Sequence, residues 1–289
     1  MKLQELRLQI EAVLKPNYSA SESKAILMVY LEDKLGINRF SKDDESDAEI
    51  PEDLKDEINS DILQLSKGVP VQYVTGIQWF WGEKYLVTPD VLIPRPETEE
   101  LVVWISEQYK TLQVKLKILD IGTGTGCIPI SLKLKMPSAD VFATDISPKA
   151  IHVAKLNAAR LDADVTFIQD DILNSAFVPV EKFDLIISNP PYIPKSEGKL
   201  LDKNVMDNEP HLALFVSDED PLIFYKAILN YAKSNLKPFG HIFFEIHKDF
   251  GADIIKLPEM ESFEQISLHN DISGNPRFVR AVLREQNIH

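Results

Sequence analysis

The stretch Lys115–Lys135, KLKILDIGTGTGCIPISLKLK, decides the fold of this chain. It sets a short, continuously apolar segment, a loop with three glycines and a helix-like segment in direct succession. Short apolar strands followed by helices are typical of a parallel sheet that is covered on both faces. Glycine lets the backbone turn tightly and approach a ligand closely. The stretch therefore predicts an α/β fold with a ligand-binding loop after its first strand.

The same alternation continues towards the C-terminus. Strands are expected at 140–146, 165–169, 183–189 and 241–246, and helices at 147–161 and 221–236. The tail 263–285 reads as two more strands around SGNP, which would add an antiparallel hairpin at the sheet edge. The central pattern thus indicates one open, mostly parallel sheet.

Towards the N-terminus the pattern changes. Apolar residues recur at helical spacing in three segments, Leu3–Leu14, Ser21–Leu35 and Pro51–Leu65. Aromatic and β-branched residues punctuated by glycine and proline follow and indicate a hairpin. We therefore expect a helical domain over 1–70, a hairpin linker over 71–94 and the α/β domain over 95–289.

Composition narrows the class of protein. The chain has 289 residues, of which 44% are apolar and 26% charged, and no apolar run approaches the roughly 20 residues that span a bilayer. No signal peptide is recognisable, so we expect a cytoplasmic protein. Cys127 is the only cysteine and the histidines lack metal-ligand spacing, so no metal site is expected. A net charge of -14 argues against direct nucleic-acid binding and permits a basic protein partner.

The glycine loop points to a nucleotide-type cofactor. It consists of Gly122, Thr123, Gly124, Thr125 and Gly126, directly after Asp120 and Ile121. The dinucleotide fingerprint needs a small residue where this chain has Cys127. Glycines in the order GxGxG behind an acidic residue favour S-adenosylmethionine over NAD. Asp120 is expected to hold the loop or the amino group of the cofactor.

Acidic residues end the next two strands. Asp145 could accept hydrogen bonds from both ribose hydroxyls. It could instead cap the next helix, but Ser147, directly before Pro148, makes the better helix cap. Asp171 could accept from the adenine amino group, and Ile172 could cover the ring. Ligands of open α/β sheets lie at the carboxyl ends of the strands, so these residues should share one crevice.

The fourth strand ends in Asn189, Pro190, Pro191 and Tyr192. The prolines restrict their own φ and that of the preceding residue, so Asn189 is held before substrate arrives. The Asn189 side-chain oxygen and the Pro190 carbonyl could accept both N–H bonds of a planar NH2 group and so aim its nitrogen at a methyl group. Tyr192 offers an aromatic wall. The turn alone admits adenine, guanine or glutamine as the acceptor.

Six blocks together resemble the release factor glutamine methyltransferases, the HemK family of Rossmann-like S-adenosylmethionine enzymes. They are GVPVQYVTG (68–76), VLIPRPETEELV (91–102), ILDIGTGTGCI (118–128), SNPPYIP (188–194), NEPHLALFV (208–216) and DISGNPRFV (271–279). The resemblance spans nearly the whole chain. The NPPY block alone is shared with nucleic-acid methylases that act on adenine N6 or guanine N2, which leaves base methylation as the alternative function.

The resemblance implies the substrate and the roles of residues. The substrate would be the glutamine of the Gly-Gly-Gln motif in class I peptide release factors, methylated on N5. The position of domain 1–70 suggests that it recognises the release factor, and we expect a monomer. Carried over by position, the loop Gly122–Gly126, Asp145, Ile172 and Asn189 would contact S-adenosylmethionine. Asn189, Pro190, Pro191 and Tyr192 would hold the glutamine, with Asn189, Pro190 and Tyr192 catalytic.

Two departures from the family pattern and one ion pair complete the expectations. Glu245-Ile246-His247 replaces a Glu-Ile-Gly stretch, and Ile172 replaces an aromatic residue found in some relatives, which would weaken adenine stacking. The 91–102 block is expected to close over the methionine end of the cofactor. Arg95 could pair with Glu97 there, although a helix start explains Glu97 almost as well.

Overall fold

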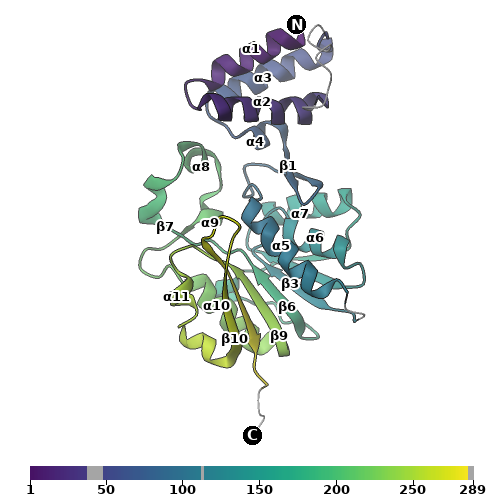
Figure 1. Cartoon of the computed structure of the whole chain (residues 1–289). Coiled ribbons are helices and arrows are strands. Elements are labelled where there is room, and N and C mark those ends of the chain that lie inside the picture. The colour runs from purple at the N-terminus through teal and green to yellow at the C-terminus, as the bar shows by residue number, and fades with distance from the viewer. Residues whose placement is uncertain (38–47, 112–113, 286–289) are drawn as a thin grey trace. The chain divides into compact units, whose positions relative to one another are not determined.

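The computed structural model describes residues 1–37, 48–111 and 114–285 (Figure 1). The described chain separates into two compact units. The first consists of Met1–Ile77 and Asp202–Asn208, and the second of Gln78–Leu201 and the chain from Glu209 onward.

The first unit is helical. Its elements are α1 (Leu3–Leu14), α2 (Ala20–Leu35), the 3-10 turn η2 (Glu52–Leu54), α3 (Lys55–Ser66), α4 (Val71–Thr75) and α8 (Lys203–Asn208). The apolar residues that predicted the helices form the buried core of this unit, as at Leu6 and Ile10 of α1. Two asparagines attach α8 within the unit: Asn204 Nδ2 donates to the Tyr18 hydroxyl at 2.8 Å, and Asn208 Nδ2 donates to the Gly68 carbonyl at 3.3 Å.

The second unit contains a seven-stranded sheet with the order β10-β11-β9-β6-β3-β4-β5. Its strands are β3 (Lys117–Ile121), β4 (Asp140–Asp145), β5 (Val165–Gln169), β6 (Phe183–Ser188), β9 (Leu236–Glu245), β10 (Phe263–Asn270) and β11 (Pro276–Leu283). Strands β5, β4, β3, β6 and β9 run parallel. The tail forms the expected antiparallel hairpin, with β11 paired to β9 and β10 at the edge.

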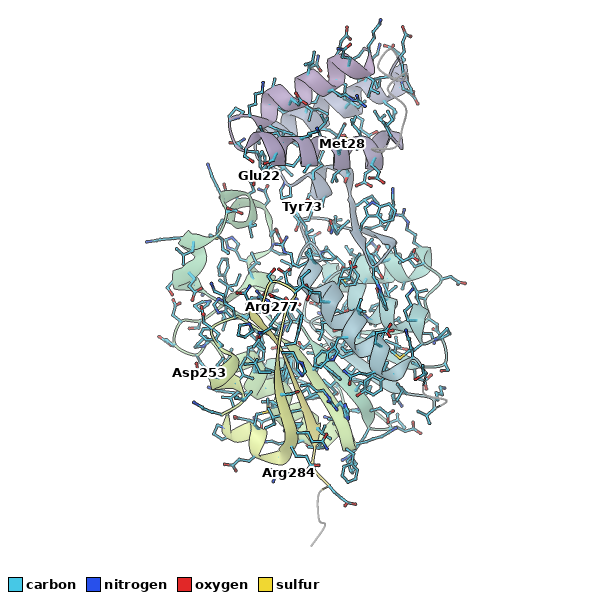
Figure 2. All side chains as sticks on the ribbon, viewed as in Figure 1. Glu22, Met28, Tyr73, Asp253, Arg277 and Arg284 are labelled. Atoms are coloured by element: carbon cyan, nitrogen blue, oxygen red, sulfur yellow. The ribbon has the colours of Figure 1, made fainter. Side chains whose placement is uncertain are left out.

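Helices cover both faces of this sheet, as the continuously apolar strands predict (Figure 1). They are α5 (Pro96–Tyr109), α6 (Cys127–Lys135), α7 (Pro148–Arg160), α10 (Ile223–Asn235) and α11 (Gly251–Ile254). The unit also contains the short helix α9 (His211–Leu214) and the 3-10 turns η3 (Ile172–Asn174), η4 (Lys195–Leu200) and η5 (Pro258–Ser262). Alternate strand residues serve the two faces: Ile118 packs with α5 and α6, and Leu119 packs with α10. Figure 2 shows the side chains that fill these layers.

Two short ladders complete the second unit. The hairpin of β1 (Ile77–Phe80) and β2 (Glu83–Leu86) packs on α6, where the Tyr85 and Ser131 hydroxyls hydrogen-bond at 2.8 Å. The pair β7 (Ile193–Pro194) and β8 (Phe215–Val216) is parallel. It ties the end of the SNPPYIP block to the end of the 208–216 block.

Within the described residues, each helix is either too short or too polar to cross a membrane. The same residues include no group of three histidine, cysteine or acidic side chains arranged to hold a metal ion.

Candidate active site

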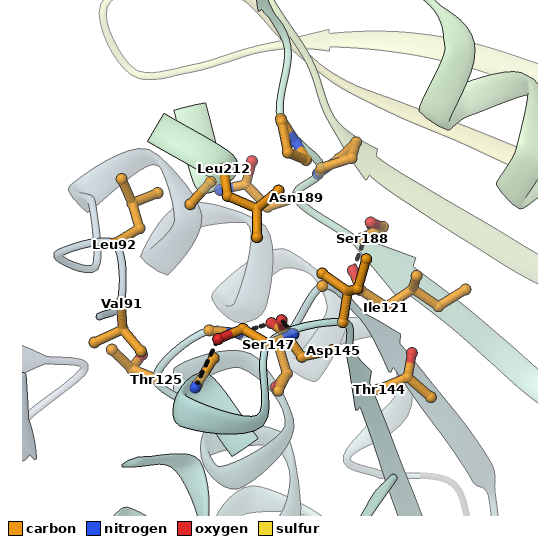
Figure 3. A pocket seen from close by; sticks show the side chains of 18 of the residues that line it. Val91, Leu92, Ile121, Thr125, Thr144, Asp145, Ser147, Ser188, Asn189 and Leu212 are labelled. Atoms are coloured by element: carbon orange, nitrogen blue, oxygen red, sulfur yellow. Dashed lines mark hydrogen bonds between the residues drawn. The ribbon is translucent and has the colours of Figure 1, made fainter. Parts of the chain in front are cut away.

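The main cavity of the second unit lies at the carboxyl ends of the parallel strands and has a volume of about 390 Å³ (Figure 3). The chain runs from β3 outward to β4 and β5, and then returns to the other side of β3 for β6. This reversal of direction opens a crevice between the loops that follow β3 and β6. The volume falls in the usual range for a small-molecule site.

The first glycines of the loop create space for a ligand. Gly122 and Gly124 both line the cavity and have positive φ angles of 79° and 54°. A Cβ added at either position would meet no atom within 4 Å, so the loop leaves open space on that side. Only glycine adopts such φ angles without strain. Thr123 and Thr125 line the same wall.

Gly126, the last glycine of the loop, has a role in helix packing. Gly126 does not line the cavity; a Cβ there would lie 2.9 Å from Ile130 Cδ1 and 3.1 Å from Ala154 Cβ. Its φ of 80° also disfavours any other residue. Gly126 therefore allows α6 to start and to pack closely on α7, rather than contacting a ligand directly.

Asp145, at the end of β4, joins the loop to the cavity. Its Oδ2 accepts from the Gly124 amide at 2.8 Å and its Oδ1 accepts from the Ser147 amide at 2.9 Å. Burial raises the pKa of Asp145, and the two amide hydrogen bonds oppose this shift. Each carboxylate oxygen keeps a second lone pair for a ligand hydroxyl. Ser147 itself caps α7, because its hydroxyl accepts from the Ala150 amide.

Asp120 lies behind the loop and not in the cavity wall. It is fully buried, and neither its carboxylate oxygens nor the Thr123 hydroxyl make a hydrogen bond of ordinary geometry with the described residues. Burial raises the pKa of Asp120 to about 7; Thr123 opposes the shift and the Asp145 charge adds to it. This buried position behind the loop suits a role in supporting the loop.

The end of β5 supplies the next part of the wall. Asp171 and Ile172 both line the cavity. The Asp171 carboxylate caps η3, accepting from the Leu173 amide and from Asn174 Nδ2, each at 3.0 Å. Ile172 packs partly against the core and presents an aliphatic surface in place of an aromatic ring.

Asn189 lies across the cavity from Asp145 and beside Leu212 (Figure 3). Its Nδ2 donates to the Thr98 hydroxyl at 3.1 Å. No hydrogen bond joins its Oδ1 to another residue in the part of the chain that the structure describes. Pro190 and Pro191 also line the cavity, and β7 fixes the chain directly after them. The amide oxygen is thus available to a ligand on a backbone with little freedom.

A buried network supports this amide. Thr98 Oγ1 donates to Glu245 Oε2 at 2.7 Å, and the Tyr192 hydroxyl donates to Glu245 Oε1 at 3.4 Å. Burial raises the pKa of Glu245 to about 7, with Thr98, Arg277 and Tyr192 opposing the shift and Glu97 adding to it. Tyr192 does not line the cavity. The wall expected from its ring is formed by the two prolines instead.

The sequence missed three parts of the site. Thr98 and Glu245 were not singled out, although Thr98 lies in the 91–102 block and Glu245 in a block treated as a local departure. The expected pairing of Arg95 with Glu97 is wrong: Arg95 Nη2 pairs with Glu209 Oε1 at 2.6 Å. Glu97 lies in the first turn of α5, which explains it as a helix start. The apolar rim residues Leu92 and Leu212 were also not foreseen.

Comparisons with known proteins agree with this arrangement. Residues 104–213 match the family model of the methyltransferase small domain. A release factor glutamine methyltransferase of Flavobacterium psychrophilum is 47% identical over 225 residues, which are 77% of this chain and 79% of that protein. One of Bacteroides thetaiotaomicron is 39% identical over 272 residues, 94% of this chain and 97% of that protein. In fold, a methyltransferase crystal structure from Pyrococcus furiosus is similar with a TM-score of 0.52, at 17% identity over 71% of this chain and 91% of that one.

The fold, the matching family model and the relatives together define the class: this is an α/β methyltransferase, with its cavity at the switch point of a seven-stranded sheet. The relatives narrow this class, because two of them share more than a third of their residues with the chain over most of its length. The chain belongs to the release factor glutamine methyltransferase family.

Proposed function

We propose that this chain transfers a methyl group from S-adenosylmethionine to the side-chain nitrogen, N5, of the glutamine in the Gly-Gly-Gln motif of class I peptide release factors. Membership of the family supports the substrate. The observation that carries the proposal is Asn189, whose amide oxygen is free of protein partners among the described residues and borders the cavity on a proline-fixed turn.

The residues of the cavity fit S-adenosylmethionine. Gly122 and Gly124 leave open space at the wall, Asp145 keeps lone pairs for ribose hydroxyls, and Asp171 with Ile172 offers an acceptor and an apolar surface for adenine. When bound, the cofactor supplies an electrophilic methyl group on a sulfonium.

The substrate side of the site acts by holding an amide. The nitrogen of a carboxamide is planar and its lone pair is delocalised, so attack depends on orientation more than on basicity. The Asn189 Oδ1 and the Pro190 carbonyl would each accept one N–H of the glutamine. The N–H that is lost after methylation is then already directed at an oxygen. Tyr192 contributes through Glu245 rather than by contact, and Pro191 keeps the turn rigid.

The helical domain, 1–70, is the proposed contact for the release factor. Its helices share a buried apolar core of their own, which extends to Val71 and Val74 just beyond residue 70. The net charge of -14 suits a basic protein partner and disfavours a nucleic-acid substrate. Monomeric state and cytoplasmic location stay predictions.

Transfer of labelled methyl groups tests the function. The chain is incubated with labelled S-adenosylmethionine and a purified class I release factor, and in parallel with the same factor carrying Ala in place of the acceptor glutamine. We expect label in the first protein and none in the second. Equal labelling of both factors would contradict the proposal, because the label would then lie on another residue. Faster labelling of DNA or ribosomal RNA would contradict it and would favour base methylation.

A further inference from the structure

The Asn189 amide is held in one orientation by Thr98, which also lines the cavity, and by Glu245 behind Thr98. An asparagine amide presents an oxygen on one branch and an NH2 on the other, and the two branches differ little in shape. Only the oxygen can accept an N–H of the substrate amide. The orientation of this group therefore decides whether the site can bind its substrate productively.

Hydrogen-bond direction settles the orientation. A threonine hydroxyl has one hydrogen to donate and lone pairs to accept with. Thr98 Oγ1 lies 2.7 Å from Glu245 Oε2. When Glu245 is ionised, which its pKa of about 7 allows at neutral pH and above, its carboxylate can only accept, so Thr98 donates to it. The Thr98 oxygen then accepts from Asn189 Nδ2 at 3.1 Å. The NH2 of Asn189 faces Thr98, which leaves the oxygen on the other branch for a ligand.

The relay is buried and anchored at its far end. Thr98 is 3% exposed and Glu245 is 1% exposed, so water does not compete for these hydrogen bonds. The Tyr192 hydroxyl donates to the second carboxylate oxygen, and the Tyr225 hydroxyl donates to the Glu245 backbone carbonyl at 3.1 Å. Burial raises the pKa of Glu245, and the charge of Arg277, at the start of β11 (Figure 2), opposes this shift.

We propose that Thr98 and Glu245 are positioning residues, which act through Asn189 by fixing its amide oxygen towards the substrate. The proposal rests on the proposed function, because it assigns the relay to the glutamine-holding part of that reaction. Neither residue needs to contact the substrate. A reversed relay, in which Thr98 donates to the Asn189 oxygen, would present an NH2 to the substrate N–H groups and would repel them.

Two pairs of matched variants test the relay. Thr98→Val keeps the shape and removes the hydroxyl, whereas Thr98→Ser keeps the hydroxyl. Glu245→Met removes the acceptor, whereas Glu245→Gln keeps an oxygen for Thr98 and an NH2 that can donate to the Tyr192 oxygen. We expect kcat for methylation of the release factor to fall about 10-fold or more in Thr98→Val and Glu245→Met, the loss of one oriented hydrogen bond. Thr98→Ser and Glu245→Gln should stay within about threefold of the parent.

A double-mutant cycle separates positioning from general damage. If Thr98 acts only through Asn189, adding Thr98→Val to Asn189→Ala should reduce kcat no further. Circular dichroism and the affinity for S-adenosylhomocysteine report whether each variant is folded. If Thr98→Val does not fold, Thr98→Ala, which leaves room for water, takes its place in the cycle.

The outcomes are distinct. A parent chain that does not label the release factor would remove the proposed function and, with it, this relay. A parent chain that labels the factor, together with full kcat in Thr98→Val or with effects that multiply in the cycle, would overturn the relay and leave the function intact. Low kcat with unchanged cofactor affinity, rescued by the conservative variants, would support it.

Discussion

Two asparagines in the second unit, Asn157 and Asn189, have different roles: one stabilises the fold and the other leaves a group for a ligand. Asn157 of α7 is fully buried: its Oδ1 accepts from the Leu86 amide at 2.6 Å, and its Nδ2 donates to the carbonyls of Leu86 at 3.0 Å and Thr125 at 2.9 Å. Among the residues that the structure describes, the Asn189 side chain hydrogen-bonds only to Thr98, and it leaves its oxygen at the cavity. A side chain whose groups are all paired within the protein stabilises the fold, and one with a group left over can bind a ligand.

The comparison also separates two kinds of rigidity. Asn157 clamps β2 and the glycine loop onto α7 from behind the loop. Asn189 is held by the prolines that follow it and by the hydroxyl of Thr98, which is distant along the chain but hydrogen-bonded to Asn189. The first arrangement fixes the wall of the cofactor cavity, and the second fixes one acceptor atom. Substitutions at the two positions should therefore change different measured quantities.

The largest effect is expected from Asn189→Ala. Loss of the acceptor oxygen should lower kcat for release factor methylation between about 100-fold and 1,000-fold, as the removal of one oriented catalytic group does elsewhere. The free energy of unfolding and the affinity for S-adenosylhomocysteine should change little. Steady-state labelling and calorimetry measure both, with the exposed Asn230→Ala of α10 as control. A variant that keeps full kcat would sink the assigned role.

The next largest effect is expected from Asn157→Ala. Three backbone groups would lose their partner in a buried place, which should lower the free energy of unfolding by about 3 kcal/mol. Asn157→Asp keeps one acceptor and loses both donated bonds, so it should also be destabilised. Denaturant unfolding measures the change, and Lys155→Ala on the exposed side of α7 is the control. An unchanged midpoint in both variants would show that the clamp contributes nothing.

The glycines of the loop divide in the same way. Gly126→Ala forces a Cβ against Ile130 and Ala154 at a positive φ, so we expect the free energy of unfolding to fall by about 2 kcal/mol. Gly124→Ala meets no atom of the protein and should cost about 1 kcal/mol from φ alone, while weakening cofactor affinity more strongly. Denaturant unfolding measures the free energy of unfolding of both variants, and calorimetry measures their cofactor affinity. A larger loss of stability in Gly124→Ala than in Gly126→Ala would contradict the two assigned roles.

The smallest expected effect is a pH dependence at Asp120. The pKa of Asp120 is about 7 in the folded chain and has its ordinary value of 3.8 in the unfolded chain, so the folded state binds the proton more tightly. Stability is then greatest at low pH within this window and is lost as pH rises towards the folded pKa. Relative to the parent, Asp120→Asn should gain at least about 1 kcal/mol between about pH 5 and pH 7. Denaturant unfolding without cofactor measures this difference. A difference that is independent of pH would mean that Asp120 keeps an ordinary pKa.

Much of the fold was predictable because its signals are local. Apolar periodicity, the glycines after β3 and the prolines after β6 act on neighbouring residues, and they predicted the parallel sheet, the edge hairpin and the helical segments. The meeting of Asp145 and Asn189 at one cavity also followed, since the carboxyl ends of parallel strands share one edge.

The partners of individual polar groups were not predictable. Arg95 pairs with Glu209, 114 residues away, and not with the nearby Glu97. Gly126 looks like its two neighbours in the loop, yet only its surroundings show that it serves helix packing. Nothing local to Tyr192 indicates that its hydroxyl turns to Glu245 and away from the cavity.

The sequence by itself determined that an asparagine is held rigidly beside a glycine loop, because proline and glycine restrict or free the backbone wherever they occur. Only the tertiary structure decided which way that asparagine faces. Its orientation depends on a threonine 91 residues away and on a glutamate 147 residues beyond the threonine. Hydrogen-bond direction is a property of groups that folding brings together, and no spacing along the chain encodes it.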